Sequence, residues 1–197
     1  MRIRPGRQPE AKSSAPACGR RAVFLIGFMG AGKSSVGRAL SRQLGWPFED
    51  LDERIQAREG LSIEQIFQQS GEIEFRRAEH AALRALLSEC ISSRVVALGG
   101  GTFVQRHNAV LLEEPGMSVI FLDAPVEELF RRCQQEQVER PLRGDLEQFR
   151  QLYEARRPHY ATAKLRIETA GKDIETIAAE ITTSLGLSKA GSQGAAK

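Results

Sequence analysis

The stretch Gly27-Phe28-Met29-Gly30-Ala31-Gly32-Lys33-Ser34 decides how this chain folds. An apolar run, Ala22–Ile26, precedes it, and a segment of helical period, Lys33–Leu44, begins inside it. The spacing Gly-x-x-x-x-Gly-Lys-Ser between a strand and a helix is the P-loop pattern. The sequence therefore predicts a phosphate-binding loop that joins the first strand to the first helix.

The residue types of this loop suit the predicted task. Glycines let the backbone wrap closely around phosphates, so that successive N–H groups and the positive end of the helix point at them. Lys33 can reach the β- and γ-phosphates of a nucleotide as a point charge, and the Ser34 hydroxyl can ligate a magnesium ion. An ordinary glycine-rich turn is the alternative interpretation, which the flanking strand and helix disfavour.

Short apolar runs and longer segments of helical period alternate along the rest of the chain. Further strands are predicted at Phe48–Leu51, Val95–Leu98, Val119–Leu122 and Leu165–Glu168. Further helices are predicted at Ser62–Gln69, Ile73–Leu87, Val126–Glu136, Leu146–Ala163 and Asp173–Leu185. Ser62 with Gln65 forms a predicted capping box, and Gly45 and Gly186 lie where helices are expected to end. This alternation predicts an α/β fold with five parallel strands covered on both faces.

The length and composition indicate one globular domain. The chain has 197 residues, of which 41% are hydrophobic and 27% are charged. Residues 1–21 and 188–197 show no hydrophobic periodicity, so we expect two disordered tails around a single domain at residues 22–187.

The charge and cysteine content exclude several classes of protein. A total of 28 Lys and Arg against 25 Asp and Glu leaves a net charge of +3, far from the basic excess of a nucleic-acid-binding protein. The apolar runs fall short of the ~20 residues of a membrane span. The three cysteines, Cys18, Cys90 and Cys133, match neither a disulfide framework nor a zinc site. We expect a cytoplasmic monomer without a nucleic-acid or membrane partner.

Missing motifs narrow the class of P-loop protein. The only asparagine is Asn108, so the Asn-Lys-x-Asp motif by which GTPases read their base is absent. None of the five aspartates is followed by Gly three residues later, and the Leu-Ser-Gly-Gly signature of transporter ATPases is also absent. These observations favour a small phosphotransferase.

Asp50-Leu51-Asp52 places two carboxylates at the end of the second predicted strand. In an extended segment, alternation puts both on the same side. One carboxylate could then hold magnesium while the other accepts a hydrogen bond from an attacking hydroxyl. Alternatively, Asp52 caps the helix-like stretch that follows it.

Gly99-Gly100-Gly101 follows the third predicted strand at its carboxyl end, where open parallel sheets bind ligands. A tight turn explains one or two glycines, whereas three favour a backbone pressed against a ligand.

Four arginines, Arg76, Arg132, Arg140 and Arg156, each allow a surface and a functional interpretation, because most helical arginines are solvated. Arg140-Pro141-Leu142-Arg143-Gly144 interrupts a helical run with residues typical of a mobile flap. An arginine on such a flap could close over the γ-phosphate and stabilise charge in the transition state.

Six motifs in one order make the chain resemble the shikimate kinases: Gly27-x-x-Gly-x-Gly-Lys-Ser, Asp50-x-Asp52, Phe75-Arg76-Arg77-x-Glu79, Gly99-Gly-Gly101, Arg140-Pro-Leu142 and Arg156-x-Pro158-x-Tyr160. The resemblance runs from about Ala22 to Leu187. It implies a three-layer α/β/α sandwich of the nucleoside-monophosphate-kinase-like type, with strand order 2-3-1-4-5. It also implies a shikimate-binding segment at about residues 52–90 and a lid at about residues 134–146. The implied reaction is phosphorylation of the 3-hydroxyl of shikimate by ATP, on the route to chorismate and the aromatic amino acids.

The same resemblance implies which residues bind the nucleotide. Contacts with ATP are expected at Gly30, Ala31, Gly32, Lys33, Ser34, Ser35, Arg132 and Arg140, and contacts with Mg²⁺ at Ser34 and Asp50. Arg140 would reach the transferred phosphate, and Arg132 would stack on adenine, with Arg131 as the alternative. The loop Ala170–Lys172 would close the other side of the adenine pocket.

The resemblance further implies which residues bind the acceptor. Asp52 would bind the shikimate hydroxyls, and Arg76 with Arg156 would grip the carboxylate, a task that suits the planar guanidinium group. Backbone donors are expected at Gly99, Gly100 and Gly101. The implied catalytic residues are Lys33, Asp52 and Arg140.

Two other functions are open at this point. A gluconate kinase or another small-metabolite kinase of the same fold would share Gly27–Ser34, but the Asp-x-Asp and Phe-Arg-Arg elements disfavour it. A catalytically silent nucleotide-binding module is disfavoured because every expected catalytic position is filled.

Overall fold

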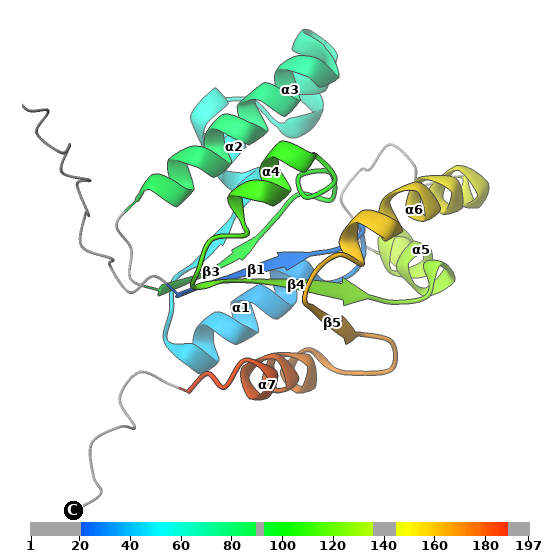
Figure 1. Cartoon of the computed structure of the whole chain (residues 1–197). Helices are drawn as coiled ribbons and strands as arrows, with labels where there is room; N and C mark the ends of the chain where they lie inside the picture. The colour runs from blue at the N-terminus through cyan, green and yellow to red at the C-terminus, as the bar shows by residue number, and fades with distance from the viewer. Residues whose placement is uncertain (1–20, 90–92, 136–144, 189–197) are drawn as a thin grey trace, which may run out of the picture.

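A sheet of five parallel strands forms the centre of the computed structural model, which describes residues 21–89, 93–135 and 145–188 (Figure 1). The strands are β1 (Arg21–Ile26), β2 (Phe48–Asp50), β3 (Ser93–Ala97), β4 (Met117–Asp123) and β5 (Leu165–Glu168). Their order in the sheet is β2-β3-β1-β4-β5, and each neighbouring pair is parallel. The expected sheet and its strand order are confirmed.

The central strand β1 shows why the sheet reads as continuous apolar runs. It pairs with β3 on one side, where Leu25 lies opposite Ala97, and with β4 on the other, where Leu25 lies opposite Ile120. The last five residues of β1 are buried, because helices cover both faces of the sheet.

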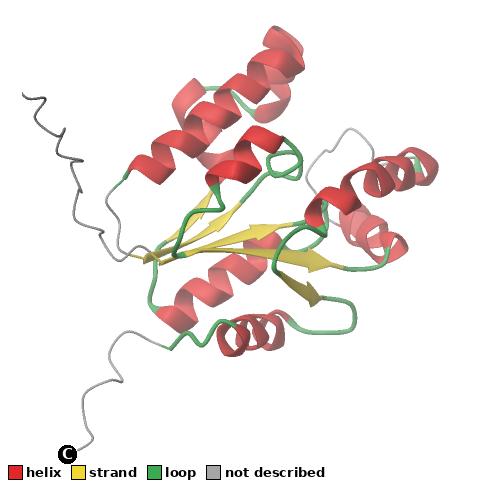
Figure 2. Cartoon of the chain, viewed as in Figure 1, coloured by secondary structure: helices red, strands yellow, loops and turns green. Residues whose placement is uncertain are grey.

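Helices lie on both sides of the sheet (Figure 2). The seven are α1 (Lys33–Leu44), α2 (Leu51–Glu59), α3 (Ile63–Ser88), α4 (Arg106–Leu111), α5 (Val126–Gln135), α6 (Leu146–Tyr160) and α7 (Ile174–Ser184), counted over the described ranges. Helices α1 and α7 contact each other on one side, and α2, α3 and α4 lie on the other (Figure 1). Helices α5 and α6 lie near the carboxyl ends of the strands. The three-layer α/β/α architecture is thereby confirmed.

The predicted capping signals work as expected. Gln65 N donates to Ser62 Oγ over 3.1 Å, and Ser62 N donates to Gln65 Oε1 over 2.8 Å, which completes the capping box of α3. Gly45 ends α1 with a φ of 69°. The two helices predicted at Ser62–Gln69 and Ile73–Leu87 are the two parts of α3, which is broken at Gly71 (φ 77°, ψ 175°).

Several element boundaries differ from the prediction. Helix α4 was not predicted and α2 was predicted only as a helix-like stretch after Asp52, because they span only 6 and 9 residues and give little helical period. Helix α6 ends at Tyr160, three residues before the predicted end, since the N–H of Ala163 turns back to the Tyr160 carbonyl. The strand predicted to reach Leu51 ends at Asp50, where α2 begins.

Three predicted segments lie largely outside the described residues. They are the two tails and the lid, because residues 1–20, 136–144 and 189–197 are not described. Arg140 and the flap motif belong to this group. Within the described ranges, no helix combines the length and apolar character needed to cross a membrane.

Candidate active site

The P-loop follows β1 and needs glycine at two positions for packing reasons. Gly27 has a φ of 146°, and a Cβ built on it would lie 2.5 Å from the carbonyl oxygen of Leu122 in β4. Gly30 has a φ of 78°, and its Cβ would lie 2.6 Å from the carbonyl oxygen of Leu129 in α5. A side chain at either position would collide with neighbouring backbone in a conformation that L-residues rarely adopt.

Lys33 begins α1 and reaches back over its own loop. Its Nζ donates to the carbonyl oxygens of Gly27 over 3.1 Å and of Phe28 over 3.0 Å. Gly32, with a φ of 85°, caps the helix, so the positive helix end and the ammonium group both belong to this loop. The loop therefore carries the features of an anion-binding site.

Asp50 joins the P-loop helix to the end of β2. Ser34 Oγ donates to Asp50 Oδ2 over 2.6 Å, while Asp50 Oδ1 accepts a hydrogen bond of 3.0 Å from the N–H of Asp52. Asp50, rather than Asp52, is thus the residue that caps the following helix. The hydroxyl and the carboxylate are neighbouring oxygen donors of the kind that Mg²⁺ prefers.

The expectation that an extended strand places Asp50 and Asp52 on the same side is wrong, because Asp52 lies in the first turn of α2. The helix nevertheless brings Asp52 to the same edge of the sheet. A Cβ built on Gly99 would lie 2.6 Å from Asp52 Oδ1. Asp52 therefore lies directly against the first glycine after β3.

The three glycines after β3 each lie against a different predicted substrate-binding side chain. None of them has a positive φ, so conformation does not explain them. A Cβ on Gly101 would lie 2.6 Å from Arg76 Nη2, and a Cβ on Gly100 would lie 3.7 Å from Arg156 Nη1. Together with Asp52 at Gly99, these contacts bring a carboxylate and two guanidinium groups to three consecutive residues.

Arg76 on α3 is held by two carboxylates. Its Nη1 lies 3.0 Å from Glu79 Oε2, and its Nη2 lies 3.2 Å from Glu72 Oε1. Glu79 is only 1% exposed and accepts a further hydrogen bond of 2.7 Å from Thr102 Oγ1. A buried carboxylate needs such compensation, so Glu79 fixes Arg76 relative to the glycine turn. Glu79 belongs to the motif Phe75-Arg76-Arg77-x-Glu79, but the motif by itself does not indicate this role.

Arg156 on α6 packs against the P-loop. Its guanidinium carbon lies 5.9 Å from the centroid of the Phe28 ring, within the range of a cation–π interaction. Phe28 also meets Phe149 and Tyr153 edge-on, at centroid distances of 4.9 Å and 5.5 Å. Since residues 149, 153 and 156 share one face of α6, this face connects Arg156 with the nucleotide loop.

A buried carboxylate at the end of β4 anchors α6. Asp123, 2% exposed, accepts hydrogen bonds of 3.1 Å from Tyr153 Oη and from Arg157 Nη2. Burial and the negative charge of Asp123 raise the pKa of Tyr153, which therefore stays a donor. This contact could not be predicted from the sequence, because nothing in the spacing of Asp123 and Tyr153 shows that they meet.

Arg132 spans from α5 to the loop after β5. Its Nη2 donates to the carbonyl oxygen of Thr169 over 3.1 Å, and its Nε donates to Glu128 Oε1 over 3.0 Å. Arg131 is exposed and bonds to Glu128 and Gln135 of its own helix. Of the two candidates, Arg132 is the one next to the loop expected to border adenine.

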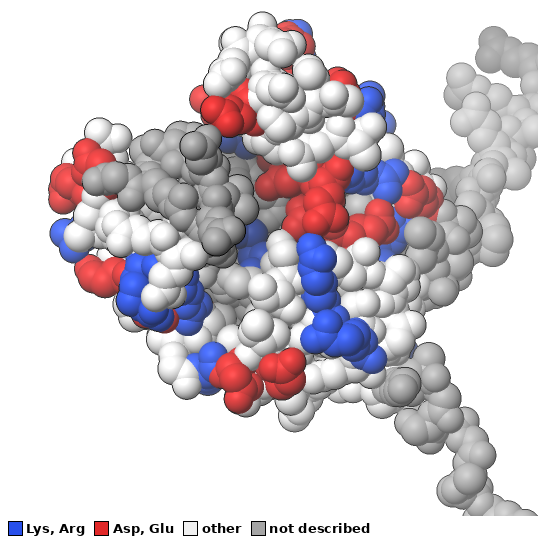
Figure 3. All heavy atoms as spheres, turned by 180° about the vertical axis from the view of Figure 1, so that it is seen from behind, with Lys and Arg blue, Asp and Glu red and all other residues white. Residues whose placement is uncertain are grey.

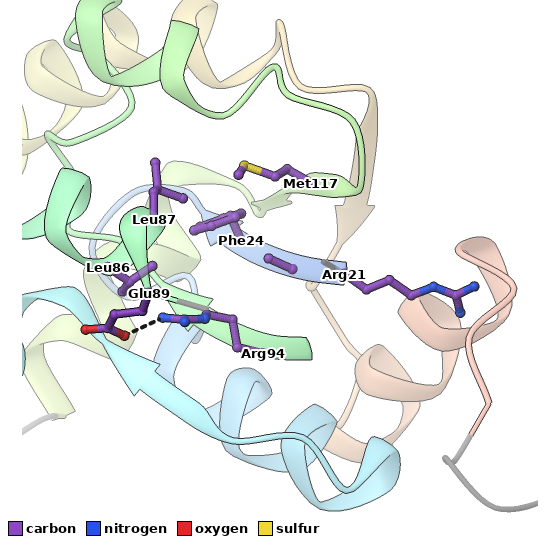
Figure 4. Close-up of a pocket in the computed structure, with 8 residues that line it drawn as sticks. Arg21, Phe24, Leu86, Leu87, Glu89, Arg94 and Met117 are labelled. Atoms are coloured by element: carbon purple, nitrogen blue, oxygen red, sulfur yellow. Dashed lines mark hydrogen bonds and ion pairs between the residues drawn. The ribbon is translucent and has the colours of Figure 1, made fainter. Parts of the chain in front are cut away.

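Two hollows lie at the opposite edge of the sheet, near the amino ends of β1 and β4. The first, about 20 Å³ in volume, is lined partly by Phe24, Leu87 and Met117, and Glu89 bonds to Arg94 at its border (Figure 4). It has room for about one water molecule. The second, about 250 Å³, lies between Trp46 and Leu187. Neither hollow is lined by a predicted site residue.

Charged side chains of both signs adjoin one another on the face seen from behind (Figure 3). A group of acidic side chains lies below the protruding α2–α3 part, with basic side chains beside and below it. The basic side chains of the described residues form separate groups on this face (Figure 3).

Known proteins are similar to this chain in sequence and in fold. The shikimate kinase family model matches residues 29–186. A shikimate kinase from Geobacter sulfurreducens is 46% identical over 173 residues, which cover 86% of this chain and 93% of that protein. The crystal structure of shikimate kinase from Aquifex aeolicus has a TM-score of 0.74 and 38% identity, and covers 84% of this chain and 96% of that one. Shikimate kinase from Acinetobacter baumannii in complex with shikimate gives a TM-score of 0.74 and 34% identity, with coverage of 85% and 94%.

Proposed function

Because the chain belongs to the shikimate kinase family, we propose that it transfers the γ-phosphoryl group of ATP to the 3-hydroxyl of shikimate. The observation that carries this proposal is the convergence of Asp52, Arg156 and Arg76 on Gly99–Gly101. A small acid with several hydroxyl groups needs cations for its carboxylate and an acid for its hydroxyls. This edge of the sheet offers both, next to a phosphate-binding loop.

The nucleotide is proposed to bind along the P-loop. Backbone N–H groups of residues 30–35 would face its phosphates, and Lys33 would exchange its loop carbonyls for phosphate oxygens. Arg132 would border adenine, supported by its bonds to the loop after β5. Arg140 is proposed to reach the transferred phosphate from the lid.

Magnesium is proposed to bind at Ser34 and Asp50, whose oxygens lie 2.6 Å apart. When bound, the ion would neutralise charge on the β- and γ-phosphates. Asp50 also caps α2, so the same carboxylate sets where Asp52 stands.

Shikimate is proposed to bind between α3, α6 and the turn after β3. Arg76 and Arg156 would hold its carboxylate from two sides, and N–H groups of Gly99–Gly101 would add neutral donors. This arrangement leaves Asp52 for the hydroxyl groups at the other end of the molecule.

The reaction then needs Asp52 to accept the proton of the attacked hydroxyl. The hydroxyl oxygen bonds to the γ-phosphorus, while the bond from that phosphorus to the β–γ bridging oxygen breaks and ADP leaves. Lys33 and Arg140 are proposed to stabilise the charge on the transferred group, because phosphoryl transfer depends mainly on positioning and electrostatics.

A coupled assay of ADP release tests this function. The enzyme receives ATP and magnesium with shikimate, gluconate, quinate or no acceptor. We expect turnover with shikimate alone, and we expect Asp52→Asn to abolish it while ATP still binds. Turnover with gluconate would favour the other kinase, and ATP binding without turnover on any acceptor would favour a silent module.

Independently of the reaction, we propose a cytoplasmic location and a monomeric state for the protein. Light scattering on the purified chain measures the second, and a dimer mass would contradict it.

A further inference from the structure

Tyr160 carries a buried hydroxyl to which the mechanism above gives no role. It is the last residue of α6, one turn beyond Arg156, and it is 0% exposed. Its ring packs on Phe121 of β4 with a centroid distance of 5.4 Å. Packing accounts for the ring, but it does not account for the hydroxyl.

The hydroxyl points at the glycine turn. Tyr160 Oη donates a hydrogen bond to the carbonyl oxygen of Gly100. A Cβ built on Gly100 would lie 3.9 Å from this hydroxyl and 3.7 Å from Arg156 Nη1. The hydroxyl, the guanidinium group of Arg156 and the Gly100 peptide therefore share one small space.

The surroundings of the Tyr160 hydroxyl shift its pKa in both directions. Burial raises the pKa of Tyr160 to about 12, while Arg156 and Arg76 act in the opposite direction. The hydroxyl thus keeps its proton at neutral pH and acts as a donor.

The geometry of the peptide bond turns this contact into an effect on the substrate site. The carbonyl of Gly100 and the N–H of Gly101 belong to the same planar trans peptide and point in opposite directions. Between two glycines this peptide has wide freedom to rotate. A donor that holds the Gly100 carbonyl also fixes the direction of the Gly101 N–H.

We infer that Tyr160 is a positioning residue for the acceptor site: it locks the Gly100–Gly101 peptide so that the Gly101 N–H and Arg156 together face the carboxylate of the substrate. This inference rests on the proposed function, because shikimate is the ligand it concerns. It assigns to α6 a second role in the site, which acts through the backbone of the turn.

The variant Tyr160→Phe tests the inference, because it removes the hydroxyl and keeps the ring on Phe121. We expect KM for shikimate to rise about tenfold, with KM for ATP and kcat within about twofold of wild type. Titration calorimetry with shikimate alone should show the same loss of affinity. Tyr160→Met, a second variant without a donor, should give the same pattern if the first folds poorly.

Ser41→Ala is the matched control. Ser41 Oγ also donates to a backbone carbonyl, that of Trp46, at the end of α1 away from the site. We expect it to lower the melting temperature and leave both KM values unchanged.

A double-mutant cycle separates positioning from general weakening. Because the Gly101 N–H and Arg156 are inferred to hold the same carboxylate, the losses of shikimate affinity in Tyr160→Phe and Arg156→Lys should not add, and additive losses would contradict the inference. An unchanged KM for shikimate in Tyr160→Phe, or equal rises in both KM values, would overturn the inference. Absence of wild-type turnover with shikimate would instead overturn the proposed function.

Discussion

Two glycine-rich turns lie at the carboxyl edge of the sheet, and they use glycine for different physical reasons. In the P-loop, Gly27, Gly30 and Gly32 all have positive φ angles, and two of them approach the backbone of β4 and α5. In the turn Gly99–Gly101, no φ is positive. Asp52 occupies the Cβ space of Gly99 and Arg76 that of Gly101, while Arg156 lies in ordinary contact range of Gly100.

The difference separates a requirement of the fold from a requirement of the site. A side chain in the P-loop meets carbonyl oxygens that cannot move without disturbing a strand or a helix. A side chain at Gly99 or Gly101 meets instead the side-chain ends of Asp52 and Arg76, which are proposed to bind the substrate. Substitutions in the first turn should therefore cost stability, whereas those in the second should cost substrate binding.

The largest expected effect comes from Lys33→Met, which keeps every glycine of the P-loop and removes the positive charge of the lysine. We expect kcat to fall by at least about 10³-fold, because the ammonium group stabilises the transferred phosphate. The free energy of unfolding, from urea titration, should change by no more than about 1 kcal/mol. Turnover close to wild type would remove Lys33 from the mechanism.

Gly30→Ala should have the next largest effect, and it should act on the fold. Its Cβ would lie 2.6 Å from the Leu129 carbonyl oxygen and 2.9 Å from Cys133 Sγ, at a φ of 78°. We expect a loss of about 3 kcal/mol in the free energy of unfolding, from the overpacking and the backbone strain together. A stable variant with only a raised KM would erase the contrast between the two turns.

Gly101→Ala should have a smaller effect, confined to the acceptor. Its Cβ would displace the guanidinium group of Arg76, so we expect kcat/KM for shikimate to fall about 30-fold with an unchanged KM for ATP. Gly100→Ala is the matched comparison, because its nearest contact is at 3.7 Å, and it should cost only about threefold. Equal losses in the two variants would contradict the proposed crowding at Gly101.

The smallest expected effect on stability belongs to Gly32→Ala. Gly32 has a φ of 85°, but the nearest atom to its Cβ is 3.9 Å away, in Val36. Only the conformational cost remains, so we expect a loss of about 1 kcal/mol in thermal or urea unfolding. A loss as large as that of Gly30→Ala would show that strain, and not contact with neighbouring backbone, dominates in this loop.

The comparison also shows which inferences could be drawn from the sequence. The P-loop could be predicted because its residues are adjacent and its strand and helix flank it. The sheet could be predicted because buried parallel strands are short apolar runs. The three glycines after β3 could be singled out from the sequence, and contact of their backbone with a ligand stays a prediction, but the crowding of Gly99 by Asp52 and of Gly101 by Arg76 could not be foreseen.

Contacts between distant residues could not be predicted. Glu79 meets Arg76 because the two are one helical turn apart on α3. Its bond to Thr102, however, depends on how α3 packs on the glycine turn. Asp123 and Tyr153 are 30 residues apart, and only the docking of α6 on β4 brings them together. Asp52 reaches the site through a short helix that the sequence indicated only as a helix-like stretch.

The sequence by itself determined the order of elements, the nucleotide loop and the residue types of the site, because local periodicity and short motifs encode them. The tertiary structure decided that a carboxylate from α2, one guanidinium group from α3 and another from α6 meet at three glycines. It did so because parallel strands end at a common edge, so elements remote in sequence are brought to one place by packing alone.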